Sequence, residues 1–194
     1  MNIRKPLFLL LLFVGACATD SHSPSAEDVG QWQQTAEKLT TLLKEEKFRE
    51  TENLTKTKIA ELLENANDTE ENDTLIKYAR QILSISYYNY LKSKQFRSGI
   101  EYMDSLSQIS FIHENCKHEL LSARASLHQM HGNNEQAIKL ANEYLQLPDY
   151  EDADRFIPQA EIVSGVYIYS GNDIPQALSL IHISEPTRHS LISY

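Results

Sequence analysis

Apolar residues recur with the spacing of an α-helix from Val29 onwards, and the alternation typical of β-strands is rare. In the first of these segments Trp32, Leu39 and Leu43 fall on one helix face. Gly, Asn and Pro residues separate the periodic segments, as they do between helices. The pattern predicts an all-α fold with helices after Ser25, after Phe48, from about Thr74, from Phe96 to Leu106, from Asn115 to His131, from Glu135 to Leu147, from Asp152 to Ser170 and from near Pro175.

Two of the expected connections share the same turn chemistry. Gly132-Asn133-Asn134 and Gly171-Asn172-Asp173 each place a glycine just after a periodic segment and capping residues just after the glycine. A glycine at this position adopts the left-handed conformation that ends many helices, and an asparagine side chain can cap the next one. We expect Gly132 to close one helix, and either asparagine after it to open the next.

The segment from Ser122 to Leu147 has the features of a helical hairpin with a close crossing. Small residues precede and follow the turn, and a proline closes the second helix: Ala125, His128, Gly132, Ala137, Ala141, Tyr144 and Pro148. This order resembles a tetratricopeptide repeat, in which small residues lie where the two helices cross. The resemblance implies that Ala137 faces Ala125, because a larger side chain would hold the helices apart.

Weaker matches to the same repeat extend over most of the chain. Thr51, Gly99, Ala137 and Ala177 stand at the crossing position, separated by 48, 38 and 40 residues. These separations exceed the family's period of about 34. The resemblance implies antiparallel hairpins stacked as a degenerate tetratricopeptide-like α-solenoid over residues 29–177. An irregular array of helical hairpins is the alternative, and it would also bury a continuous core between neighbours.

The N-terminus has the layout of an export signal. Arg4 and Lys5 precede an apolar run from Leu7 to Val14, which is far shorter than the roughly 20 residues that span a bilayer. Val14-Gly15-Ala16-Cys17 resembles a bacterial lipobox, which implies that residues 1–16 are removed and Cys17 is acylated. Residues 17–28 would then form a tether to a membrane facing the periplasm or the cell exterior. Ordinary signal cleavage after Ala18 is the alternative.

The C-terminus resembles translated sequencing-adaptor DNA. The peptide from Leu178 to Arg188 is the translation of a transposon-end adaptor, and the final Ile192-Ser193-Tyr194 fits the same adaptor in frame. We therefore expect residues 178–194 to be non-native and the repeat domain to be truncated near Ala177. A truncated array lacks its polar terminal helix, so we also expect an exposed apolar patch and self-association.

Composition narrows the possible partners. The chain has a net charge of -9, and its lysines are dispersed, so a nucleic-acid partner is not expected. Membrane attachment would come from the lipid on Cys17 and not from a basic surface. The chain has two cysteines, so acylation of Cys17 would leave Cys116 without a disulfide partner. A small, half-buried side chain is the simplest interpretation of Cys116.

No catalytic motif is recognisable, and we expect neither a catalytic residue nor a cofactor. His128 and His131 lie one helical turn apart, but they lack the acidic partner and spacing of a helical zinc motif, so no metal site is expected. The tyrosines offer the best candidate contacts. Tyr87 and Tyr90 fit packing positions, whereas Tyr88 and Tyr102 are the candidate partner-binding residues, since an exposed tyrosine both packs and hydrogen-bonds.

Two functions agree with these features. The first is an exported, lipid-anchored repeat protein that binds a peptide or protein partner without catalysis. The second is the sensor region of a membrane-bound histidine kinase or repeat-containing regulator, to which the order of signal, tether and repeats is similar. The intact gene beyond Ala177 would distinguish them: an apolar run of roughly 20 residues leading to a cytoplasmic output domain would favour signalling.

Overall fold

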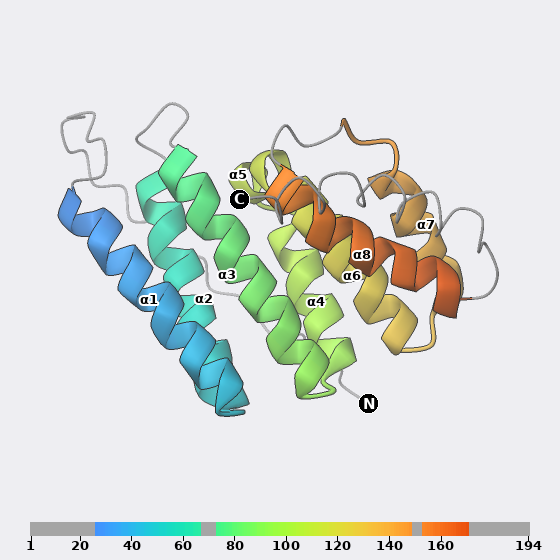
Figure 1. Ribbon diagram of the computed structural model, residues 1–194, viewed down its shortest axis with the longest axis horizontal. Coiled ribbons are helices and arrows are strands. Elements are labelled where there is room, and N and C mark those ends of the chain that lie inside the picture. Colours follow the sequence, from blue (N-terminus) through green and yellow to red (C-terminus); the bar gives the residue numbers. More distant parts are fainter. Residues whose placement is uncertain (1–25, 67–72, 149–152, 171–194) are drawn as a thin grey trace, which may run out of the picture.

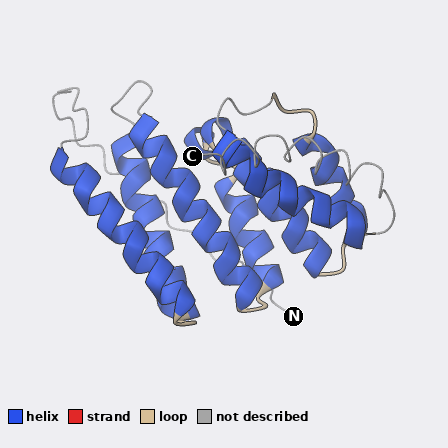
Figure 2. Cartoon of the chain, viewed as in Figure 1, coloured by secondary structure: helices blue, strands red, loops and turns tan. Residues whose placement is uncertain are grey.

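The computed structural model describes residues 26–66, 73–148 and 153–170, and these are entirely helices and short connections (Figure 2). The all-α prediction is therefore confirmed for the described part of the chain. Its eight helices are α1 (Ala26–Lys44), α2 (Phe48–Ala66), α3 (Asp73–Lys92), α4 (Phe96–Leu106), α5 (Ser110–Asn115), α6 (Lys117–Met130), α7 (Asn134–Tyr144) and α8 (Ala153–Tyr169).

Most expected helices occur within a few residues of their predicted ends, with one addition. Helix α5 was not predicted, because Ser110–Asn115 is too short to produce a periodic pattern. Helix α7 ends at Tyr144 and not at Leu147 as predicted. Leu145 and Leu147 lie in the connection after the helix and pack against the apolar core. Helix α8 begins at Ala153, close to the predicted Asp152, and contains Pro158. The helix expected from Pro175 lies outside the described residues.

The helices lie side by side in a stack that runs from α1 at one end to α7 and α8 at the other (Figure 1). Helices α1 and α2, α3 and α4, and α6 and α7 pack as consecutive pairs. Each pair also contacts the first helix of the next: α1 and α2 contact α3, α3 and α4 contact α6, and α6 and α7 contact α8. The short helix α5 packs against α6.

Two apolar clusters hold this stack together, and α6 contributes to both. The larger cluster spans α1 to α6 and contains Leu127 of α6, which is fully buried. The smaller cluster joins α6, α7 and α8 and contains Ala125 and Ala137, both with no exposed surface. Both alanines are therefore buried in the cluster between α6 and α7, as expected, and their direct contact at a helix crossing stays a prediction. Since α6 faces neighbours on several sides, eight of its residues are buried.

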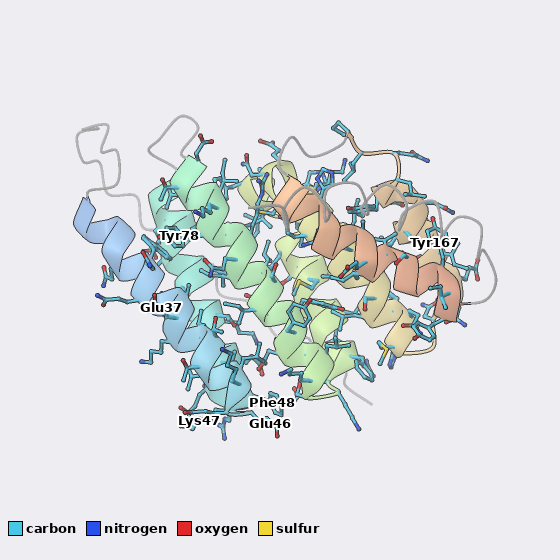
Figure 3. The ribbon with its side chains drawn as sticks, in the orientation of Figure 1. Glu37, Glu46, Lys47, Phe48, Tyr78 and Tyr167 are labelled. Atoms are coloured by element: carbon cyan, nitrogen blue, oxygen red, sulfur yellow. The ribbon has the colours of Figure 1, made fainter. Side chains whose placement is uncertain are left out.

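The three turns that join paired helices have the same backbone geometry. Glu46, Lys94 and Gly132 occupy the left-handed region, with φ of 58°, 59° and 87°. In each turn the following amide donates to the carbonyl five residues earlier: Lys47 to Leu42, Gln95 to Tyr90 and Asn133 to His128. This is the Schellman pattern, which satisfies the last helix carbonyls. Glu46 and Lys47 lie at the tip of the α1–α2 pair, next to Phe48 (Figure 3).

The prediction for Gly132 is confirmed, and so is an asparagine cap. Asn133 accepts a hydrogen bond from the Gln136 amide at 3.3 Å and so caps α7. Neither of the equivalent turns has a glycine, so the sequence did not reveal them. A side chain in the left-handed region costs about 1 kcal/mol relative to glycine. The turns at Glu46 and Lys94 form nonetheless, because the helices on both sides are packed.

We expect Glu46→Gly and Lys94→Gly each to stabilise the protein by about 0.5–1 kcal/mol, since glycine removes the steric cost of a positive φ. Gly132→Ala should destabilise it by about 1 kcal/mol for the same reason. Nothing lies within 4 Å of the position of a Gly132 Cβ, so the change in stability reports the backbone conformation and not a steric clash. Urea unfolding of the three variants measures the effect, and equal stabilities would contradict the turn geometry.

Several sequence-based expectations lie outside the described residues. They are the signal at residues 1–16, the acylated Cys17, the start of the tether and the adaptor-like segment at residues 178–194. Within the described residues, no helix is both long and apolar enough to cross a membrane. At the end of α8, Ile168 and Tyr169 are exposed by 46% and 74%, whereas Val166 and Tyr167 are buried. Among the described residues of α8, the exposed large apolar side chains thus lie in its last turn, and the predicted patch and self-association stay predictions.

Candidate binding groove

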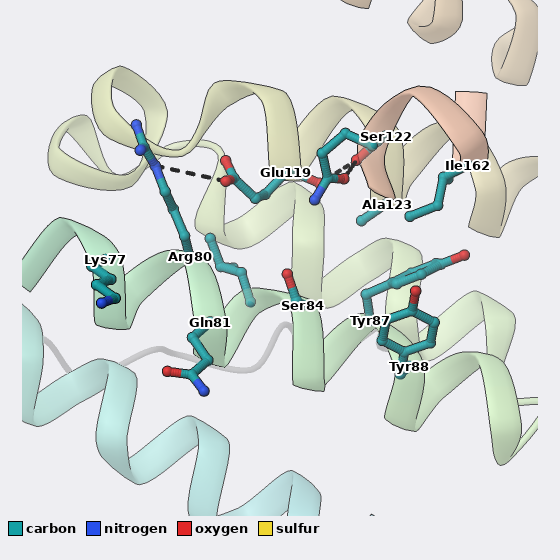
Figure 4. A pocket seen from close by; sticks show the side chains of 12 residues that line it. Lys77, Arg80, Gln81, Ser84, Tyr87, Tyr88, Glu119, Ser122, Ala123 and Ile162 are labelled. Carbon is teal, nitrogen blue, oxygen red and sulfur yellow. Dashed lines mark hydrogen bonds and ion pairs between the residues drawn. The ribbon is translucent and has the colours of Figure 1, made fainter. Parts of the chain in front are cut away.

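A groove of about 500 Å³ lies between helices α3, α6 and α8 (Figure 4). Most of its lining comes from α3, with α6 forming the opposite wall and α8 one end. Polar and apolar side chains are mixed along it, as is usual in binding sites. The lining residues are Lys77, Arg80, Gln81, Leu83, Ser84, Tyr87, Tyr88, Glu119, Ser122, Ala123, Gln159 and Ile162.

An ion pair crosses the groove between its two long walls. The Arg80 Nε of α3 lies 3.6 Å from the Glu119 Oε1 of α6, and the Glu119 side chain is only 5% exposed. The same Arg80 Nε donates to the Asn115 carbonyl at 2.8 Å, at the C-terminal end of α5. A cation at this end of a helix interacts favourably with the exposed carbonyls. Arg80 therefore joins α3 to both α5 and α6.

Two further hydrogen bonds join α6 to the helices on either side of it, α8 and α3. The Ser122 hydroxyl forms a short hydrogen bond with the Gln159 side chain of α8, and its oxygen lies 3.1 Å from the Glu119 carbonyl oxygen in its own helix. The Tyr87 hydroxyl and the Ser126 hydroxyl lie 2.9 Å apart, joining α3 to α6. Burial raises the pKa of Tyr87, although the Ser126 hydrogen bond acts in the opposite direction. Tyr87 is thus a packing residue that keeps its proton.

Tyr88 is the exposed aromatic side chain of the groove. It is 40% exposed, and its ring lies 4.9 Å from the buried ring of Tyr87, which supports it from α3. Ile162 of α8 lines the same end and packs partly against the core (Figure 4). A supported aromatic ring beside an aliphatic side chain is a typical anchor for a partner. The structure therefore places the predicted contact residue Tyr88 in the groove.

Lys77 lies at the opposite end of the α3 wall from Tyr88. It is exposed, and it lines both the groove and a neighbouring cavity of about 330 Å³. Asp73, Thr74, Ile76 and Arg80 complete that second cavity, which extends towards the start of α3. Arg80 and Glu119 face each other, so among the described residues Lys77 is the exposed charged side chain of the main groove.

Tyr102, the other predicted contact residue, lies elsewhere and is half-buried on α4. Its ring packs 5.9 Å from the Tyr90 ring, and the Lys56 Nζ lies 5.2 Å from its centroid. Burial and the nearby Glu52 raise the pKa of Tyr102. The Tyr90 hydroxyl donates to Glu52 at 3.0 Å, linking α3 to α2. Tyr102 therefore belongs to a packed cluster between α2, α3 and α4, and the structure does not bring it together with Tyr88.

The histidines and Cys116 take packing or surface positions. Burial lowers the pKa of His128, whose Nδ1 has no hydrogen-bond partner in the described part of the chain. His131 is exposed, and His118 bonds the Pro148 carbonyl at 3.0 Å. Among the described residues no group of three His, Cys, Asp or Glu side chains could hold a metal ion. Cys116 is fully buried, which raises the pKa of its thiol to about 12.

Sequence reasoning missed most of the groove because its walls are distant in the chain. The spacing of the lining residues along the sequence nevertheless contains a repeat. Gln81, Glu119 and Gln159 are separated by 38 and 40 residues, which are the separations of Gly99, Ala137 and Ala177, the residues expected at helix crossings. Ser84, Ser122 and Ile162 have the same separations. Positions with the same spacing on α3, α6 and α8 therefore line the groove, and this spacing could have identified them from the sequence.

No protein-family model matches this chain, and neither a curated protein nor a solved structure matches it significantly.

Proposed function

We propose that this chain is an exported, lipid-anchored helical-repeat protein that binds a peptide or protein partner in the groove between α3, α6 and α8. Binding is its function, and catalysis is not part of it. The observation that carries the proposal is the groove itself, which has the supported aromatic ring of Tyr88 at one end and the exposed Lys77 at the other. Open grooves of this kind suit an extended segment of a partner.

The repeat architecture supports this proposal. We infer that the pairs α1–α2, α3–α4 and α6–α7 are degenerate tetratricopeptide-like units, with α8 opening a fourth. In favour of this are the shared turn geometry, the contact of each pair with the first helix of the next, and the buried Thr51, Gly99 and Ala137 at one equivalent position. Stacked units of this type present an extended surface along their first helices.

The groove proposal is tested by photo-crosslinking with a benzoylphenylalanine at position 88, followed by identification of the attached partner. The same residue placed at position 169 is the matched control, since Tyr169 is 74% exposed and is not part of the groove lining. We expect a discrete partner crosslinked from position 88 and absent from position 169. Tyr88→Ala should then weaken binding of that partner about tenfold or more, as loss of an aromatic anchor does. Equal crosslinking from both positions would contradict the proposal.

Anchoring is tested separately with Cys17→Ser. A serine cannot form the thioether to the lipid, so we expect the variant to leave the membrane fraction or to remain an uncleaved precursor. Fractionation of cells expressing both forms, with detection of the chain by mass, measures this. A Cys17→Ser protein that fractionates and is processed like the wild type would support ordinary cleavage after Ala18 and would rule out the lipid anchor.

A further inference from the structure

The accessible chemistry of the groove differs between its two ends, and this difference indicates the kind of segment that fits it. At one end the exposed side chain is the ammonium group of Lys77. At the other end Tyr88 and Ile162 offer an aromatic and an aliphatic surface. Between them Gln81 and Ser84 supply neutral hydrogen-bonding groups.

The spacing of the two ends follows from helix geometry. Lys77 and Tyr88 are 11 positions apart on α3, which is close to three full turns, so both fall on the same face. At a rise of about 1.5 Å per residue this separation is about 16 Å along the helix. An extended chain advances about 3.3 Å per residue, so about five residues cover the distance.

The charge of the main groove favours an anionic group at the Lys77 end. Among the described residues, the ionised groups that line it are Lys77, Arg80 and Glu119, and Glu119 lies against Arg80, so the uncompensated charge of this lining is positive. The Asp73 carboxylate lines only the neighbouring cavity. This contrasts with the net charge of -9 for the whole chain. A carboxylate near Lys77 would therefore gain attraction there and meet repulsion from much of the remaining surface.

We propose that the groove selects extended segments that carry an acidic side chain and, four to six residues away, a large apolar side chain. The acidic group lies against Lys77, and the apolar side chain packs between Tyr88 and Ile162. This inference rests on the proposed function, because it specifies the partner of the same groove. The apolar contact provides most of the affinity, and Lys77 provides the selection for acidic segments.

The test is selection from a phage-displayed library of random twelve-residue peptides on the immobilised full chain. Because each displayed peptide is fused to the coat protein through its C-terminus, any preference for acids comes from side chains. We expect enriched peptides to have Asp or Glu at the stated distance from Leu, Ile, Phe or Trp, in one or both orders. The best peptide, labelled with a fluorophore, should bind about tenfold more weakly to Lys77→Glu than to the wild type.

Lys139→Glu on α7 is the matched control, since Lys139 is also exposed but is not part of the groove lining. It should leave binding unchanged, and selection on Lys77→Glu should favour basic peptides instead. Peptides whose binding requires Tyr88 but which lack the acidic residue or the spacing would overturn this inference and leave the groove function standing. Peptides insensitive to Tyr88→Ala, or no enrichment at all, would overturn the inference and count against the proposed function as well.

Discussion

Gly99→Ala should destabilise the protein by about 1–2 kcal/mol, even though alanine is the better helix former by about 1 kcal/mol. The reason is the close crossing of α3 and α4. A Cβ at position 99 would lie 2.8 Å from the Tyr90 Cβ and 3.1 Å from the Leu127 Cδ1. Tyr90 is fully buried and hydrogen-bonded to Glu52, so it has no free space into which to move. Thermal or urea unfolding measures the change.

Gly165→Ala and Gly30→Ala are the matched controls for this prediction. Both glycines are helical, and nothing lies within 4 Å of a Cβ built on either one. We expect each control to stabilise the protein by about 0.5–1 kcal/mol through helix propensity alone. If Gly99→Ala stabilises the protein as much as the controls do, Gly99 of α4 does not lie against Tyr90 of α3.

The position of Gly99 also shows how the sequence predicted the fold. Gly99 and Ala137 were singled out as small side chains after the turns, Thr51 was a weaker match without a small side chain, and all three are buried. Helical periodicity then located the long helices, because each one buries an apolar face. It could not locate α5, whose Ser110–Asn115 segment is held by its neighbours, with Arg80 bonded to the carbonyl of its last residue.

The candidate site was predictable only in part. Tyr88 was expected to be exposed beside the packed Tyr87 and Tyr90, and this is confirmed. The sequence could not show that Tyr102 differs from Tyr88 in its surroundings. Tyr102 is packed because α2 lies beside it and places Lys56 over its ring. The pairing of Arg80 with Glu119 joins residues from different helices and has no local signature. Such pairs depend on how neighbouring helices are aligned along their axes, and the periodicity within a single helix does not determine that alignment.

Arg80→Met should have the largest effect of any groove substitution, with a loss of stability of about 2–4 kcal/mol. Methionine keeps much of the apolar stem but leaves the Glu119 carboxylate, which is 5% exposed, without the guanidinium across the groove. It also removes the hydrogen bond to the Asn115 carbonyl. A buried carboxylate that loses its cation costs more than the intact pair contributes, because the desolvation penalty of the carboxylate remains.

A double-mutant cycle separates the ion pair from the loss of packing. Glu119→Gln removes the charge and keeps the shape, so Arg80→Met combined with Glu119→Gln should be more stable than Arg80→Met alone by about 1–2 kcal/mol. Urea unfolding of the four proteins gives the interaction energy. Additive effects would mean that Arg80 acts through the Asn115 carbonyl and its stem alone. A recovered double variant would instead show that the charge of Glu119 is tolerated in the groove wall because Arg80 lies opposite it.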